Sequence, residues 1–127
     1  MANLDLKATH LLKGEYLQVD VEGIYAKHSI LKILEKAMQT CQEHGITLLL
    51  LQLTELDIKK LSIIHRYLIG EASAGIFPSH IKVAVILNKE DYDGTTEIIA
   101  KDRGVNTRFF FSINEGEDWL LQDKLSK

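Results

Sequence analysis

The sequence has little of several features that would assign a protein to a class at once. Its single cysteine, Cys41, has no partner within the chain, which excludes a disulfide-stapled scaffold. The longest apolar runs, at 48–51 and 83–87, are far shorter than the ~20 residues of a membrane-spanning helix. Fifteen basic and eighteen acidic residues give a formal charge of −3, so the basic excess of a nucleic-acid-binding surface is missing.

The chain does contain enough apolar material for one hydrophobic core. It has 127 residues, 46% of them hydrophobic, and a chain of this length buries roughly two-thirds of its unfolded surface. We therefore expect one domain over residues 1–127. The first residues include an early acid and no apolar stretch, so we expect no signal peptide and a cytoplasmic location.

Hydrophobic periodicity predicts alternating strands and helices. Residues 8–12 and 16–21 alternate on either side of a turn that contains Gly14, which indicates a hairpin. Further apolar runs predict strands, and segments with a period near 3.6 residues predict helices. We expect strands at 8–12, 16–21, 46–53, 81–87 and 107–112, and helices at 25–44, 58–77, 91–102 and 114–125.

This element order predicts an α/β fold with a five-stranded mixed sheet and four helices, in the order β-β-α-β-α-β-α-β-α. The first strand is expected to pair antiparallel with the second. The later strands are expected to run parallel, because each connection contains a helix long enough for a crossover. The helices 25–44 and 58–77 are expected together on one face, with Gly45 ending the first of them and Asn114 capping the last helix.

No residue pattern points to a metal centre or to catalysis. The five histidines lack helical spacing to one another, and we expect them at the surface or at helix ends. Cys41 and His44 could form a nucleophile pair, but Cys41 continues an apolar stripe and is expected in the core. Glycine loops that cradle phosphates are absent, and the carboxylates at 91–93 and 115–118 are expected at helix starts. We therefore expect neither enzymatic activity nor a cofactor.

The helix expected at 58–77 has more apolar surface than contact with a sheet requires. A stripe about 100° wide is sufficient for that contact. The surplus predicts packing on neighbouring helices or, alternatively, contact with a partner, a bilayer surface or an apolar ligand. The expected inner stripe is Leu61, Ile64, Leu68 and Ala72, flanked by one row of Ile63, Tyr67 and Ala74 and another of Ile58, Ile69 and Ile76.

Glycines near the end of this helix favour a role as a movable lid, the alternative being a static, fully packed helix. Gly70 costs ~1 kcal/mol relative to alanine inside a helix, and Gly75 lets the chain leave helical geometry before Pro78. The residues expected to line a crevice or to touch a bilayer are Ile63, Tyr67, Ile69 and Phe77. Those expected near a headgroup or anion are Lys59, Arg66, Arg103 and Arg108, although the two arginines of the 101–108 turn could simply be solvated.

Several segments carry a resemblance to a known family. They are 63–67 (IIHRY), 81–85 (IKVAV), 99–110 (IAKDRGVNTRFF) and the Trp119-Leu120 pair. Together with the element order, they resemble the STAS fold of anti-sigma-factor antagonists and, more closely, the SpoIIAA-like family of small bacterial proteins. In such antagonists a serine at the start of the second helix is phosphorylated. Here the Ser-Ser-Gly of that turn is absent, and Ser62 is the nearby candidate acceptor, with Thr54 a poorer one.

The SpoIIAA-like family is also similar in fold to the lipid-carrying CRAL-TRIO domains, in which a mobile helix gates an apolar pocket. The resemblance therefore implies a non-catalytic module that binds an apolar or amphiphilic molecule or lies on the inner membrane face. The alternative is a protein-interaction regulator with Ser62 as a degenerate switch. We also expect a homodimer, because the sheet has open edges and the second helix offers an apolar patch. No nucleic-acid partner is expected.

Overall fold

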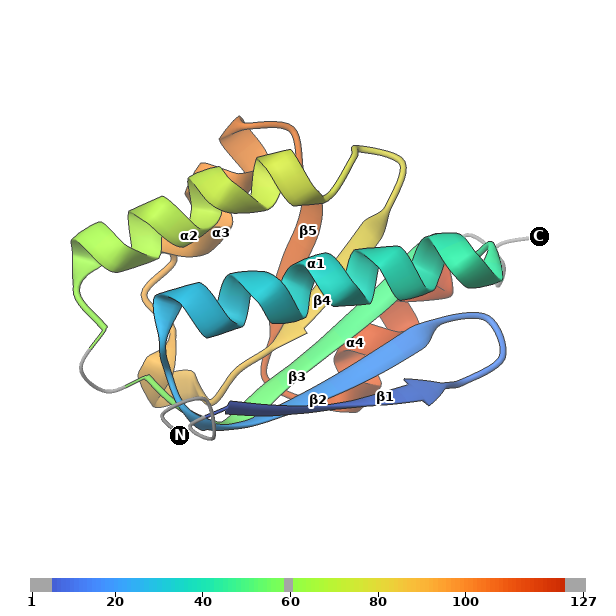
Figure 1. Cartoon of the computed structure of the whole chain (residues 1–127), viewed down its shortest axis with the longest axis horizontal. Helices are drawn as coiled ribbons and strands as arrows, with labels where there is room; N and C mark the ends of the chain where they lie inside the picture. The colour runs from blue at the N-terminus through green and yellow to red at the C-terminus, as the bar shows by residue number, and fades with distance from the viewer. Residues whose placement is uncertain (1–5, 59–60, 123–127) are drawn as a thin grey trace.

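A computed structural model of the chain describes residues 6–58 and 61–122. These residues form a five-stranded sheet and four α-helices in the predicted order (Figure 1). The elements are β1 (Leu6–Leu12), β2 (Leu17–Ile24), α1 (Lys27–His44), β3 (Leu48–Asp57), α2 (Ile63–Ile76), β4 (Lys82–Ile86), the 3-10 turn η2 (Lys89–Asp91), α3 (Thr95–Asp102), β5 (Asn106–Phe110) and α4 (Ile113–Leu120).

The strands lie side by side in the order β1-β2-β3-β4-β5. β1 pairs antiparallel with β2, and the hairpin turn is closed by a 2.9 Å hydrogen bond from the Lys13 amide to the Tyr16 carbonyl. Gly14 adopts φ 86°, a left-handed conformation that glycine enters without steric penalty. The other three pairings are parallel. The predicted mixed sheet is therefore confirmed.

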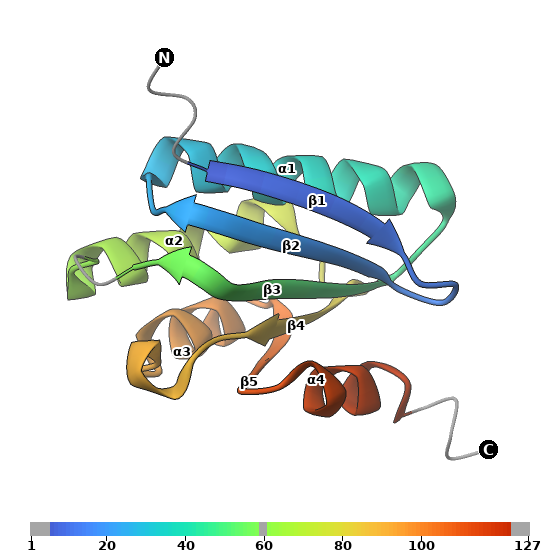
Figure 2. The ribbon, with the colours of Figure 1, turned by 90° about the horizontal axis from the view of Figure 1, so that it is seen from below.

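Helices cover both faces of the sheet, and alternating strand residues supply a core on each. Leu49 and Leu51 of β3 face α1, α2 and α3, whereas Leu50 faces α4. Figure 2 shows α1 and α4 on opposite sides of the sheet. The prediction that the first two helices share a face is confirmed.

The boundary between β3 and α2 differs from the prediction. β3 continues to Asp57, and α2 begins at Ile63. Leu56 pairs with Gly23 of β2 and is 5% exposed, so the sheet retains this stretch. Ser62 then starts the helix, because its Oγ accepts a 3.2 Å hydrogen bond from the His65 amide.

Two other helix starts were placed wrongly. The cap of α4 is Ser112, whose Oγ accepts from the Glu115 amide at 3.2 Å, so Asn114 lies inside the helix. The helix predicted at 91–102 is divided into η2 and α3, because Gly94 takes φ 85° and interrupts it. The helix end predicted at Leu125 lies outside the described residues.

Candidate functional site

The side of α2 that faces the protein interior is not the predicted one. Ile64, expected in the inner stripe, is 70% exposed, and Ile63 is 69% exposed. The buried positions in the helix are Gly70 and Ser73, and Phe77 follows directly after it at 3% exposure. Small residues therefore face inward, and the large apolar side chains of the first turns face outward.

Close packing against α3 explains this orientation. A Cβ atom added at Gly70 would lie 2.8 Å from Cβ of Ile99 and 3.0 Å from the backbone oxygen of Thr96. The two helices can approach this closely only where one of them lacks a side chain. The contact with α3 thus sets the rotation of α2 about its axis and turns Ile69 toward the sheet.

A cavity of about 100 Å³ lies beneath α2, is lined by residues of α1, α2, α3 and the sheet, and is partly open to solvent. Its walls are mainly apolar. We call it the α2 cavity. Ile69 and Phe77, two of the expected ligand-lining residues, form part of its wall. Other apolar wall residues include Ile30, Leu34, Leu51, Val83, Val85 and Phe109.

The other two expected lid residues lie elsewhere. Ile63 and Tyr67 are absent from the cavity wall and are exposed at 69% and 38%. With Ile64, they form an exposed apolar surface on the first turns of α2, which we call the outer α2 surface. Ser62, the candidate phosphate acceptor, is exposed beside it as the helix cap. The structure thus separates the predicted group into an inward pair and an outward pair.

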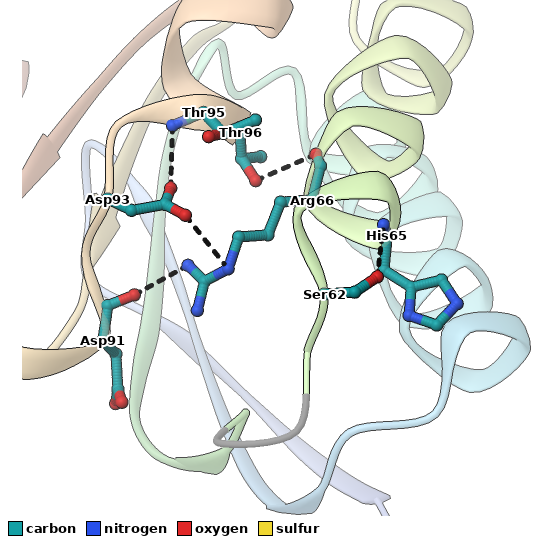
Figure 3. Close-up of polar contacts among 7 residues, drawn as sticks. All are labelled: Ser62, His65, Arg66, Asp91, Asp93, Thr95 and Thr96. Carbon is teal, nitrogen blue, oxygen red and sulfur yellow. Dashed lines mark hydrogen bonds and ion pairs between the residues drawn. The ribbon is translucent and has the colours of Figure 1, made fainter.

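Arg66 lines the cavity, and Figure 3 shows its side chain directed from α2 toward Asp91 and Asp93 in the loop before α3. Its Nη1 donates to the Asp91 carbonyl at 2.8 Å, and its Nε lies 3.4 Å from Oδ2 of Asp93. The Arg66 side chain is only 14% exposed. Thr96 Oγ1 donates to the Arg66 carbonyl at 3.0 Å, and Asp93 Oδ1 accepts from the Thr95 amide at 2.8 Å. The guanidinium is therefore held by groups of the protein itself.

The remaining predicted basic residues do not join Arg66. Arg103 lies on the surface, where its Nη2 is 2.7 Å from Oε2 of Glu71 and 3.2 Å from the Tyr67 hydroxyl. Arg108 pairs in register with Ala84, whose side chain belongs to the core beneath α4, so it lies on the opposite face of the sheet. Lys59 lies outside the described residues. The structure therefore does not bring Arg66, Arg103 and Arg108 together into one anion site.

Two polar wall residues were not singled out from the sequence. Tyr25 lines the α2 cavity, and its hydroxyl is buried without a hydrogen-bond partner among the described residues. Glu97 also lines it and accepts from the Tyr92 hydroxyl at 2.5 Å and from the Phe109 amide at 3.0 Å. Its hydrogen bond raises the pKa of Tyr92 to about 12. The sequence signal that could have indicated Glu97 is the position of an acidic residue on the buried side of the short helix α3.

A second, polar cleft of about 310 Å³ lies at the carboxyl ends of β3 and β4. Its carboxylates are Glu55, Asp57, Glu90 and Asp91. Within 6–58 and 61–122, no group of three potential ligands is arranged to hold a metal ion. Nor does any helix in these segments have the length and apolarity to cross a membrane.

Cys41 is fully buried in the core, as predicted. Burial raises the pKa of its thiol to about 11. Because the thiolate is the reactive form, this environment disfavours the nucleophile pair with His44 that the spacing allowed.

Comparison of the sequence with family profiles and with curated proteins finds no match. Solved structures do match. An anti-sigma factor antagonist from Mycobacterium paratuberculosis superposes with a TM-score of 0.63 at 10% identity, over 91% of this chain and 93% of that one. An uncharacterised protein of the DUF3478 family from Shewanella loihica PV-4, described as having a SpoIIAA-like fold, matches with a TM-score of 0.54 at 19% identity over the same shares. The chain has a SpoIIAA-like STAS fold.

Proposed function

We propose that this SpoIIAA-like protein is a non-catalytic module that binds a small apolar or amphiphilic molecule in the α2 cavity. The observation that carries the proposal is an apolar cavity of about 100 Å³ under a helix whose own buried positions are small residues. Ligand pockets are typically lined by apolar side chains with a few polar groups that orient the ligand. Tyr25 supplies such a group here.

Access to the cavity is proposed to lie between the first turn of α2 and the loop before α3. Arg66 and Asp93 both line the cavity and pair with each other at 3.4 Å, so separating them opens its wall. The tight contact at Gly70 holds the middle of α2 against α3. The movable lid is therefore the first turn of the helix, and the rest of α2 stays packed.

A matched pair of variants tests the cavity. Ile69→Trp fills it from the helix side, whereas Ile63→Trp adds the same bulk on the exposed side of the same helix. Titration with benzene, followed by methyl NMR, is expected to shift wall residues in the wild type and in I63W but not in I69W. Native mass spectrometry of the purified protein checks for a retained ligand. Equal shifts in both variants, or no shift in the wild type, would contradict the proposal.

The second candidate function is a protein-interaction regulator of the STAS type. The observation that favours this function is the position of Ser62, which is an exposed helix cap next to the outer α2 surface. A phosphate there would add negative charge at a helix N-terminus and beside a contact surface. The similarity to an anti-sigma factor antagonist supports this candidate.

We propose the outer α2 surface as the contact site for a protein partner, a second copy of the chain or the inner membrane face, with the protein in the cytoplasm. Three neighbouring exposed apolar side chains form it. Incubation of the Ser62→Asp and Ser62→Ala variants with a bacterial lysate and with anionic liposomes separates these options. Loss of a specific protein contact in S62D alone is expected for the regulator. Binding that is identical in both variants would contradict it.

A further inference from the structure

Tyr25 lies in the connection between β2 and α1, and it lines the α2 cavity. Its amide donates to the Asp57 carbonyl at 2.9 Å, and its ring centroid lies 6.4 Å from that of His65 on α2. Backbone and ring contacts therefore fix the residue on both sides. Its hydroxyl is nevertheless buried with no hydrogen-bond partner among the described residues.

Every other polar side chain of the cavity wall is already engaged. Ser73 Oγ donates to the Ile69 carbonyl at 2.8 Å, and Thr107 Oγ1 donates to the Val83 carbonyl at 2.8 Å. The remaining four are Arg66, Asp93, Thr96 and Glu97, each with a partner described above. Tyr25 is thus the wall residue with unused hydrogen-bonding capacity in the described structure.

A buried hydroxyl without a partner is uncommon in proteins, because its desolvation is not compensated. Burial also raises the pKa of Tyr25, so at neutral pH its hydroxyl is protonated and available as a donor. The matching chemistry is a neutral acceptor oxygen on an otherwise apolar molecule. A carboxylate fits less well, since the guanidinium of the wall is already paired with Asp93.

We propose that the α2 cavity selects a small, neutral, apolar molecule with one acceptor oxygen, such as a ketone, which accepts a hydrogen bond from Tyr25 Oη. This rests on the proposed function and specifies its ligand class. The volume of about 100 Å³ is smaller than the roughly 150 Å³ of an engineered cavity that binds benzene, so the ligand is expected to be no larger than one small ring.

Cyclopentanone and its hydrocarbon isostere methylenecyclopentane are the probes, titrated by methyl NMR into the wild type and Tyr25→Phe. The wild type is expected to bind the ketone roughly tenfold more tightly than the alkene, the factor supplied by one good neutral hydrogen bond. In Y25F the ketone oxygen would be buried without a donor, so the ratio is expected to fall below one, in favour of the alkene. Tyr67→Phe removes a hydroxyl outside the cavity and is expected to keep the wild-type ratio.

A second measurement does not depend on a variant. The infrared carbonyl band of cyclopentanone bound to the wild type is expected to shift to lower frequency than in hydrocarbon solvent, because a hydrogen bond weakens the C=O bond. A ratio of one in the wild type, a ratio that persists in Y25F, or an unshifted carbonyl band would overturn the ligand class while leaving apolar binding intact. If neither probe binds the wild type, the proposed function fails as well.

Discussion

Gly70 and Gly75 lie in the same helix but in opposite surroundings. A Cβ atom at Gly70 would lie 2.8 Å from Cβ of Ile99, whereas one at Gly75 would meet nothing within 4 Å. Helix propensity favours alanine at both positions, so only the neighbourhood differs. The same residue type is therefore a packing requirement at one position and a weak point of the helix at the other.

Alanine substitution separates these roles. Gly75→Ala is expected to raise the free energy of unfolding by about 0.5–1 kcal/mol through helix propensity. Gly70→Ala is expected to lower it by about 1–3 kcal/mol, because α2 and α3 are forced apart. Urea denaturation measures both. Stabilisation by both variants would show that the two helices do not approach closely at Gly70.

His10 on β1 is a second residue whose surroundings matter more than its type. Its Nε2 is buried without a hydrogen-bond partner among the described residues. Its pKa is lowered from 6.5, mainly by burial and to a smaller extent by the positive charge of Lys36. The folded protein therefore disfavours the protonated imidazole that the unfolded chain readily forms.

The pH dependence of stability follows from this shift. Because the pKa of His10 is lower in the folded state, the unfolded state binds more protons in the pH range between the two pKa values. The contribution of His10 to the free energy of unfolding is therefore full above about pH 6.5, and it is lost as the pH falls toward the pKa of the folded state. The free energy of unfolding of the wild type is expected to fall over that window relative to His10→Leu. Urea denaturation between pH 5 and pH 8 measures the difference. Parallel profiles for the two proteins would contradict the prediction.

At the scale of elements, two ion pairs connect α2 to the α3 region. Arg66 pairs with Asp93 at 3.4 Å with its side chain 14% exposed, and Arg103 pairs with Glu71 at 2.7 Å with its side chain 43% exposed. The shorter pair lies in solvent, where screening and side-chain entropy offset most of its attraction. The longer pair is partly buried and also involves a backbone carbonyl.

Neutralising each arginine tests which pair holds the first turn of α2. Arg66→Gln is expected to lower the free energy of unfolding by about 1–3 kcal/mol, since a charge-assisted hydrogen bond is lost. It is also expected to speed amide exchange in that turn and the release of a cavity ligand. Arg103→Gln, the matched control, is expected to change neither exchange nor release. Equal effects of both variants would contradict the role of Arg66 as the closing residue.

At the scale of the whole molecule, the outer α2 surface is a group of exposed apolar side chains that core formation does not require. Ile63, Ile64 and Tyr67 are exposed on a helix whose other side encloses the α2 cavity. A contiguous exposed apolar surface of this kind marks contact sites on soluble proteins. Association and cavity binding are therefore expected to be separable by mutation.

If the outer α2 surface makes one of the proposed contacts, the double variant Ile63→Ser/Tyr67→Ser is expected to lose whichever of self-association and liposome binding the wild type shows, while its thermal melt stays nearly unchanged. Both side chains are outside the core, so their removal leaves packing intact. Sedimentation over a hundredfold concentration range and liposome flotation are the measurements. Phe77→Ser, which opens the core, is the destabilising control. A wild type that stays monomeric throughout would count against the dimer.

Local patterns were sufficient for the element order. Alternation at period two predicted the hairpin, continuous apolar runs predicted the inner strands, and glycines indicated the turns. These signals depend only on residues close in sequence. The core position of Cys41 followed from the stripe of its own helix. Boundaries were less determined, since Ser112 and Asn114 are both good caps and the strand before them decides which is used.

The orientation of α2 and the composition of the cavity depended on tertiary structure. Apolarity alone assigned Ile64 to the interior, yet the interior of this helix holds Gly70 and Ser73. The deciding contact, with Ile99, lies on another helix. Tyr25 likewise reaches the cavity wall only once α1, α2 and the sheet are assembled. Periodicity in the sequence shows which side chains are apolar. Where two helix backbones come close together, however, only small side chains fit between them, and this close approach exists only in the folded chain.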